Sequence, residues 1–213
     1  MKSPSPKRPS SLLWLAAVVF LVAPGCSLKK AYQAKSTYAL EATRSQPPVR
    51  PSSPAVVLRV RPFTAVAPFD ERVFHYRVHA VRFESDFYNE FVYSPRTLIG
   101  DQTRLWLQSA RLFGAVLEPA SRAESTHSLE GCVTALHADY RDIKSPVAVM
   151  EIRFLLLKDS SASQEIVLDK TYRQEVPLEN RQPATLAIGW SNGLKQVLTA
   201  LEQDLSLKIA PAR

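Results

Sequence analysis

Alternation of hydrophobic and polar residues predicts a series of β-strands after residue 54. A side-chain period of two is typical of a strand with one buried face. Three longer strands are predicted in the second half of the chain, and the short connections between them indicate antiparallel neighbours. In order, the predicted strands are residues 55–66, 73–83 and 115–117, followed by the apolar stripes 132–140, 148–156 and 166–176.

Two other stretches repeat hydrophobic residues every three or four positions, which is the period of an amphipathic helix. Ser94-Pro95 predicts the start of the first helix, because Ser is a favoured N-cap and Pro suits the first turn. Gly114 is expected to end it. The final helix is predicted from about residue 183 to 207, with Glu202 on its solvent face. The predicted apolar face of the first helix comprises Leu98, Ile99, Leu105, Trp106, Leu112 and Phe113.

These elements predict one layered α/β domain over residues 55–213, with a mixed β-sheet covered by two main amphipathic helices. Residues 26–54 precede it as a basic, proline-rich segment, which is interpreted as an extended tether. Within that segment, residues 37–40 form a β-prone island that is expected to add a short strand to the edge of the domain.

Residues 1–25 have the pattern of a secretory leader. Three basic residues stand in the first eight positions, and residues 12–22 form an apolar run without charge. That run is too short to span a bilayer. Small residues precede Cys26, which suits cleavage on the N-terminal side of this cysteine. The mature chain would then have 188 residues (213 − 25).

Ala23-Pro24-Gly25-Cys26 resembles the lipobox of bacterial lipoproteins, with Ala23 where Leu is the commonest residue. The resemblance implies that Cys26 carries two or three acyl chains, such as palmitate. One acyl chain anchors a protein only marginally, whereas two or more hold it stably on a membrane surface. The alternative is an ordinary secretory peptide with an incidental cysteine, but the position and flanks of Cys26 favour lipidation.

The positive charge of the chain is concentrated before the domain. The formal net charge is +7, from 27 basic and 20 acidic residues. The leader contributes three basic residues, and the tether contributes five against one acid, so residues 55–213 hold 19 of each sign. A neutral domain on a basic tether suits an anionic membrane surface better than a nucleic acid.

The chain has two cysteines. If Cys26 is acylated, Cys132 has no partner, and a structural disulfide is excluded. Cys132 stands in a strand-like stretch, which favours a buried, unreactive thiol over a reactive one.

Gly189-Trp190-Ser191-Asn192-Gly193 matches the Gly-x-Ser-x-Gly pattern of esterases. In that motif the serine follows a buried strand and precedes a helix. Here Trp190 and Leu194 already belong to the apolar stripe of the final helix. The sequence therefore favours a helix that tolerates two glycines over a catalytic serine.

The other polar residues also lack a recognisable catalytic or metal-binding spacing. His75 and His79 are four residues apart, which suits zinc on a helix, but the alternation around them predicts a solvated strand face. No glycine-rich phosphate loop is present in the sequence. Asp139, Asp142 and Glu151 are interpreted as surface charge. The sequence thus predicts no catalytic, metal or cofactor site, and no enzyme activity.

A set of short motifs spans nearly all of the mature chain. They are Cys26, Tyr38-Ala39-Leu40, Phe74-His75-Tyr76-Arg77, Phe87-Tyr88-Asn89-Glu90-Phe91, Leu112-Phe113-Gly114-Ala115-Val116, Leu129-Glu130-Gly131-Cys132-Val133 and the leucine-rich final helix. In this combination the chain resembles the bacterial ABC-type transport auxiliary lipoproteins, a group that includes the paraquat-inducible C-type lipoproteins. It departs from many members at residues 91–95, where they have a tryptophan-containing segment.

The resemblance implies a three-layer α/β sandwich of the anticodon-binding-domain-like type. It also implies a non-catalytic periplasmic lipoprotein that serves an envelope lipid transporter. The partners would be an MCE-type substrate-binding protein and an ABC permease and ATPase. Some relatives assemble as rings, so a homo-oligomer is a further expectation.

The location follows from the same kind of resemblance. Ser27, and not Asp, follows Cys26, which by similarity to sorted lipoproteins points to the periplasmic face of the outer membrane. The alternative function is an outer-membrane scaffold or activator that binds a peptidoglycan-synthesis or Tol-type envelope protein.

Overall fold

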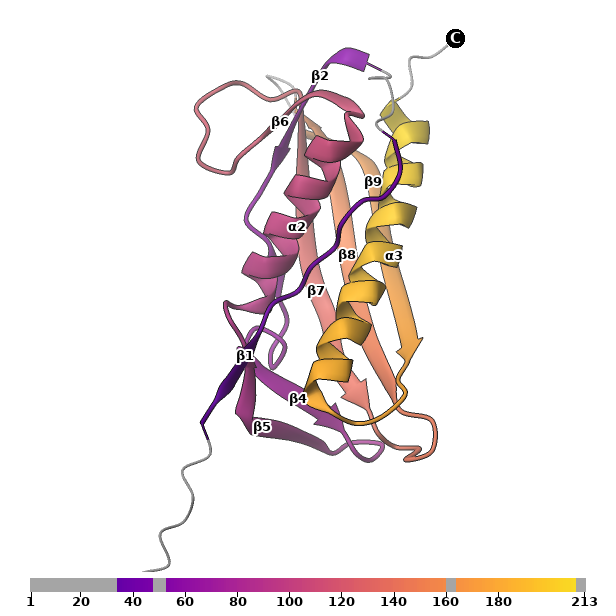
Figure 1. Ribbon diagram of the computed structural model, residues 1–213. Helices are drawn as coiled ribbons and strands as arrows, with labels where there is room; N and C mark the ends of the chain where they lie inside the picture. The colour runs from indigo at the N-terminus through magenta and orange to yellow at the C-terminus, as the bar shows by residue number, and fades with distance from the viewer. Residues whose placement is uncertain (1–33, 48–52, 160–163, 210–213) are drawn as a thin grey trace, which may run out of the picture. The chain divides into compact units, whose positions relative to one another are not determined.

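The computed structural model describes residues 34–47, 53–159 and 164–209 (Figure 1). Cys26 and the predicted leader lie outside these ranges. The described residues belong to one folded unit that begins at Ala34, inside the segment interpreted as a tether. Within the described ranges, no helix combines the length and the hydrophobicity that a membrane span requires.

The described ranges contain nine strands in one mixed sheet and two helices. These elements are β1 (Ser36–Tyr38), β2 (Ser53–Val60), β3 (Thr64–Ala65), β4 (Val73–Arg77), β5 (Phe83–Phe91), α2 (Pro95–Ala110), β6 (Phe113–Leu117), β7 (His127–Asp139), β8 (Val147–Asp159), β9 (Gln164–Pro177) and α3 (Pro183–Ile209). Strands are hydrogen-bonded in the order β1-β5-β4-β7-β2-β6, while β3 also pairs with β7, and β8 pairs with β7 and β9.

The long strand β7 joins the two parts of the sheet because it uses both of its edges. One edge pairs in parallel with β2, β3 and β4 in succession. The other edge pairs with β8 in antiparallel orientation, and β8 pairs in the same way with β9. This confirms the antiparallel arrangement that the short connections predicted for the three long strands.

Both helices pack on one face of the sheet (Figure 1). Ala148, Met150 and Phe154 of β8 share that face because side chains alternate along a strand. α3 lies against Ala148 and Met150. Phe154 contacts Phe63, which in turn packs against Gly100 of α2. The predicted α/β sandwich, a mixed sheet with two covering helices, is confirmed.

The first helix begins as predicted and ends earlier than predicted. Ser94 is its N-cap residue. The helix stops at Ala110, before Gly114, because Arg111 adopts the left-handed conformation with φ of 52°. A left-handed residue ends an α-helix even where it is not glycine. Leu105 is 48% exposed, so it does not belong to the buried face of this helix as predicted.

α3 approaches β8 closely at Gly189. A Cβ atom at this position would lie 2.6 Å from Cδ2 of Leu178 and 2.9 Å from Cβ of Ala148. The next residue, Trp190, is fully buried, and its indole N–H donates to the carbonyl of Val149 at 3.1 Å. Gly189 therefore allows α3 to approach the sheet closely, and the buried ring of Trp190 holds it there.

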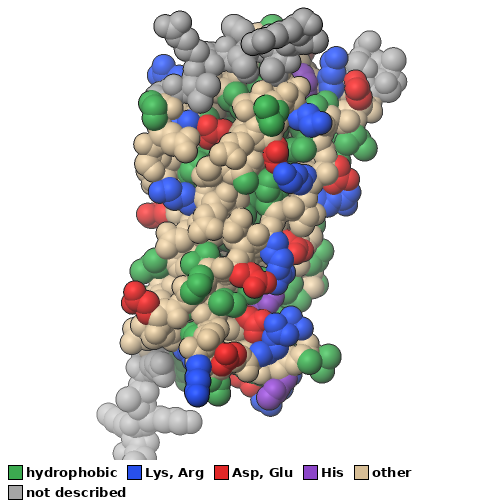
Figure 2. Space-filling model, turned by 90° about the vertical axis from the view of Figure 1, so that its right-hand side faces the viewer, with side chains coloured by type: hydrophobic (Ala, Val, Ile, Leu, Met, Phe, Trp, Pro, Cys, Tyr) green, Lys and Arg blue, Asp and Glu red, His purple; other side chains and the backbone are tan. Residues whose placement is uncertain are grey.

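The opposite face of the sheet carries charged side chains in pairs. Arg153 and Asp169 are joined across β8 and β9 by hydrogen bonds of 2.7 and 2.6 Å. Figure 2 shows Lys and Arg side chains interleaved with Asp and Glu on one side of the molecule, with hydrophobic side chains scattered between them. Charged side chains of this kind protect an edge strand such as β9 from pairing with other chains.

Two buried histidines, His75 and His137, lie beside Phe69 of the core. Phe69 stacks on His137 with ring centroids 5.7 Å apart, and its ring lies 6.0 Å from that of His75. The prediction that His75 lies on a solvated face is therefore wrong, because Phe69 helps to cover it and only 4% of it is exposed. Burial lowers the pKa of His75, and it lowers the pKa of His137 to about 4.

Candidate anchoring and docking surface

The folded unit begins a few residues after the cysteine that is expected to carry the lipid anchor. Ala34 follows Cys26, which lies outside the described residues, by eight positions. β1 then runs parallel to β5 at the edge of the sheet. The carbonyl of Tyr38 accepts a hydrogen bond from the Val92 N–H at 2.9 Å. The strand that the β-prone island predicted at the domain edge is confirmed.

Residues 39–47 cross the outer side of both helices (Figure 1), and we call this segment the strap. The Ala42 N–H donates to Oε1 of Gln102 on α2 at 2.9 Å, and the Glu41 N–H donates to Oγ of Ser191 on α3 at 3.2 Å. Residues 34–47 of the segment interpreted as a tether are therefore part of the domain. Two hydrophobic residues of the strap, Leu40 and Ala42, are buried.

Arg44 fastens the strap to α3 through a buried ion pair. Its Nε donates to Oε2 of Glu202 at 2.9 Å, and its Nη2 donates to Oε1 at 2.8 Å. Trp106 of α2 donates its indole N–H to the same Oε2 at 2.8 Å. The side chains of Arg44 and Glu202 are only 2% and 10% exposed. The hydrogen bonds that Arg44 donates to Glu202 raise the pKa of Arg44, so its guanidinium keeps its charge. The carboxylate of Glu202 thus joins the strap, α2 and α3.

The prediction that Glu202 lies on the solvent face of the final helix is wrong. Arg44 and Trp106 cover its carboxylate. Glu202 follows Leu198 by four positions and precedes Leu205 by three, and both leucines are buried. Residues at these spacings are neighbours on a helix surface, so the spacing alone could have placed Glu202 beside the apolar stripe. The sequence offered no sign that its partner stands in the strap.

Two grooves flank the strap. One of about 530 Å³ lies between the strap and α3 and is lined in part by Ile188, which is 63% exposed. The other, of about 370 Å³, lies between the strap and α2 and includes the exposed Leu105. Exposed hydrophobic side chains around a concave surface are a feature of docking sites. The strap and its two grooves, which we call the strap face, form a candidate docking surface.

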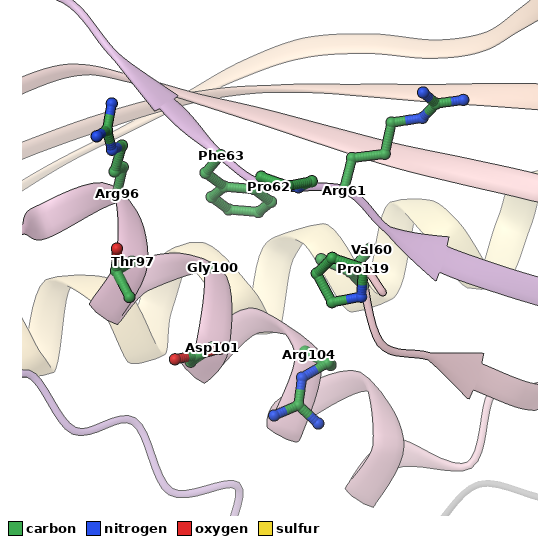
Figure 3. A pocket seen from close by; sticks show the side chains of 10 residues that line it. All are labelled: Val60, Arg61, Pro62, Phe63, Arg96, Thr97, Gly100, Asp101, Arg104 and Pro119. Carbon is green, nitrogen blue, oxygen red and sulfur yellow. The ribbon is translucent and has the colours of Figure 1, made fainter. Parts of the chain in front are cut away.

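A further hollow of about 190 Å³ lies between the β2–β3 connection and α2 (Figure 3). Phe63 forms part of its apolar wall. The guanidinium groups of Arg61 and Arg104 point away from each other in Figure 3. They pair instead with Glu130 at 3.7 Å and Glu118 at 3.6 Å. Ligand pockets usually measure about 300–1,000 Å³, so this hollow is too small to enclose a whole lipid.

Ser191 is built into α3. Its hydroxyl donates to the carbonyl of Ala187 at 2.9 Å, and the same oxygen accepts the N–H of Glu41 from the strap. A nucleophile elbow places its serine on a turn between a strand and a helix, whereas α3 begins eight residues before Ser191. This serine therefore helps to hold the strap on α3 by accepting the hydrogen bond from Glu41.

The remaining candidate residues are dispersed over the sheet. Cys132 is half-buried on β7, less deeply than the sequence predicted. Asp139 pairs with Arg141 at 2.6 Å. Glu151 accepts a hydrogen bond from Thr134, while His79 and Asp142 are exposed. In the ranges that the structure describes, no three His, Cys, Asp or Glu side chains are grouped as metal ligands would be.

Comparison with known proteins establishes the fold of the chain. No family model matches it, and no curated protein matches it. Protein XCC0632 from Xanthomonas campestris, of the DUF330 family, is similar in structure with a TM-score of 0.71 and 20% identity, over 81% of this chain and 95% of that chain. An uncharacterised protein reaches 0.63 with 13% identity, over 81% and 99%. The hypothetical protein CT253 from Chlamydia trachomatis reaches 0.50 with 6% identity, over 70% and 97%. The chain therefore has the α/β fold of the DUF330 protein.

Proposed function

We propose that this chain is a lipid-anchored envelope protein that docks onto an ABC/MCE-type lipid transport system and catalyses no reaction of its own. In this proposal Cys26 is the acylated residue, and the domain stands on the periplasmic face of the outer membrane. The partners are an MCE-type substrate-binding protein and an ABC permease and ATPase. The motifs shared with the auxiliary lipoproteins and the fold described above support this proposal.

The strap is the observation that carries the proposal. The chain that follows Cys26 enters the strap, and the buried pair of Arg44 and Glu202 joins the strap to both helices. The eight steps from Cys26 to Ala34 span at most about 28 Å when fully extended. An acylated Cys26 would therefore hold the domain close to its membrane, where a component of an envelope transporter has to stand.

The surface of the domain favours docking over lipid carriage. Exposed Ile188 and Leu105 lie beside the strap, where a partner can bury them. The hollow at Phe63 is too small for a whole lipid. In this proposal a lipid path runs through the partner or through the assembled complex, and the strap face binds the partner.

Affinity purification of the full-length protein from solubilised envelopes tests the proposal. We expect the wild type to recover an MCE-type protein as its main partner, and Ile188→Glu to recover much less of it. Ile166→Glu is the matched control, because Ile166 is equally exposed at 62% but lies on β9. Cys26→Ser separates the effect of membrane proximity from that of the docking surface.

The alternative function predicts another set of partners. Recovery of only peptidoglycan-synthesis or Tol components, together with normal lipid transport in a deletion strain, would contradict the transport proposal and favour the scaffold. Equal loss of the MCE-type protein in Ile188→Glu and Ile166→Glu would place the docking surface elsewhere.

A further inference from the structure

Exposed hydrophobic side chains gather at one end of the domain. Phe87 is 71% exposed and Tyr93 is 63% exposed, although both are large and aromatic. They lie on β5 and just after it, beside β1 at the lower end of Figure 1. We call this set the aromatic end, and it comprises Val81, Phe83, Phe87, Tyr88, Val92 and Tyr93.

Glu84 and Glu90 of β5 pair with basic side chains, whereas Asp86 of the same strand accepts hydrogen bonds from Tyr76 and Asn89. Glu90 contacts Arg72 at 2.9 Å and Lys35 at 3.5 Å, while Glu84 contacts Arg82 at 2.6 Å. These acids are therefore compensated by neighbouring bases. An anionic surface can approach the aromatic end without strong repulsion.

The direction of the strap shows at which end of the domain the described chain begins. Glu41 contacts Ser191, and Arg44 contacts Glu202, so the strap runs toward the C-terminal end of α3. Residues 34–40 therefore lie toward the N-terminal end of that helix. β1, which begins two residues after Ala34, lies at the same end as β5 (Figure 1).

The length of the chain between Cys26 and Ala34 then decides which end of the domain can meet the membrane. α3 has 27 residues and is about 40 Å long. A domain standing on the opposite end would hold Ala34 about 40 Å above the bilayer, whereas the eight steps from Cys26 span at most about 28 Å. With Cys26 in the membrane, the end that carries β1 and β5 faces the lipid.

We propose that the aromatic end rests on the surface of the bilayer in which Cys26 is anchored, with Phe87 and Tyr93 among the lipid headgroups. This inference depends on the acylation of Cys26 proposed above. Aromatic rings are favoured at the membrane–water interface, where the ring is shielded and a hydroxyl such as that of Tyr93 stays wet. The contact sets a fixed angle between the membrane and the strap face.

A tryptophan reporter tests the contact in the acylated protein. The mature chain has two tryptophans, Trp106 and Trp190, which are 3% and 0% exposed. A third one at the surface can therefore be read separately. The Phe87→Trp variant is reconstituted in vesicles that contain brominated phosphatidylcholine, whose bromine atoms quench tryptophan only on contact. We expect its emission to shift to the blue and to lose intensity.

Leu207→Trp is the matched control. Leu207 is 77% exposed and lies near the other end of α3, so its emission should be unchanged by the brominated lipid. Full emission from Phe87→Trp in acylated, vesicle-bound protein would overturn the proposal. So would equal quenching at both positions, because the domain would then have no preferred orientation. A dimer that Phe87→Glu dissociates, with no quenching, would assign the aromatic end to a second copy.

Intact-mass analysis of the same sample separates this inference from the proposed function. If Cys26 carries no acyl chain, the anchoring proposal fails at that step. The aromatic end can still be tested by coupling Cys26 of a leaderless Cys132→Ser variant to a maleimide lipid and repeating the quenching measurement. Quenching of Phe87→Trp in that sample supports the inference independently, and its absence contradicts it.

Discussion

Arg44 and Glu202 are 158 positions apart in the sequence and form a two-point ion pair beneath the strap. The pair joins the strap to the last helix of the domain, and the indole of Trp106 links the first helix to the same carboxylate. A pull on the chain that precedes the strap would thus be transmitted to both helices. The strap can leave the helices only if a buried carboxylate loses its partner.

Arg44→Met should lower the free energy of unfolding by about 3–5 kcal/mol, because it leaves Glu202 as a buried charge without compensation. Urea denaturation measures this loss. Arg153→Met is the control, since the pair of Arg153 and Asp169 is 55% and 40% exposed and such surface pairs contribute about 1 kcal/mol or less. Equal, small losses in both variants would show that the strap is not held by this ion pair.

The two glycines around Ser191 should respond to alanine in opposite ways. A Cβ at Gly189 would lie within 3 Å of Leu178 and Ala148, whereas a Cβ at Gly193 would meet its nearest atom, in Val176, at 3.6 Å. Gly189→Ala should therefore cost roughly 1–3 kcal/mol through overpacking. Gly193→Ala should be neutral or stabilise by up to about 1 kcal/mol, because alanine favours the helix. Thermal unfolding of both variants checks this, and the same response in both would contradict the packing of α3.

Ser191→Ala should leave the recovered partners unchanged and should cost about 1 kcal/mol of stability, because the Glu41 N–H loses its acceptor. Affinity purification and urea denaturation measure the two effects. Loss of an esterase activity on this substitution would favour the catalytic interpretation of the motif instead.

His137 should make the domain less stable in acid. Burial holds the pKa of His137 at about 4, whereas a histidine in an unfolded chain titrates near 6.5. The unfolded state therefore binds more protons between these two values, and stability falls as the pH drops through this window, by up to about 3 kcal/mol. The lowered pKa of His75 acts in the same direction.

Urea denaturation at pH 7 and pH 4.5 measures this dependence. His137→Leu should flatten it, whereas His79→Leu should leave it unchanged, because His79 is exposed. A wild type with equal stability at the two pH values would contradict the buried position of His137.

Periodicity predicted the long elements because burial recurs at every turn of a helix and at every second residue of a strand. The prediction of one strand over residues 73–83 is wrong, because the chain turns after Arg77 and returns as β5, which pairs with β4. The long strands β7 to β9 and the helix α3 were found on this basis. Periodicity failed where a single residue decides the outcome. Arg111 ends α2 by its own conformation, and no spacing reveals that. His75 was misplaced because Phe69, which covers it, comes from a connection that has no period of its own.

The strap was only partly predictable from the sequence. Residues 37–40 gave the edge strand, but the residues that follow are polar and lead into prolines, which is also the composition of a free tether. Their packing depends on Arg44, whose partner Glu202 is remote in the sequence and occupies a helix position that resembles a solvent face. The hydrogen bonds of the strap to Gln102 and Ser191 use backbone N–H groups, which leave no signal in the sequence.

Anchoring through Cys26 is tested most directly by the mass of the mature protein isolated from the outer-membrane fraction. We expect a chain that begins at Cys26 and carries two or three acyl chains, and that is released from the membrane by Cys26→Ser. A chain that begins at another residue, or an unmodified Cys26 in a protein that still sediments with the membrane, would contradict it.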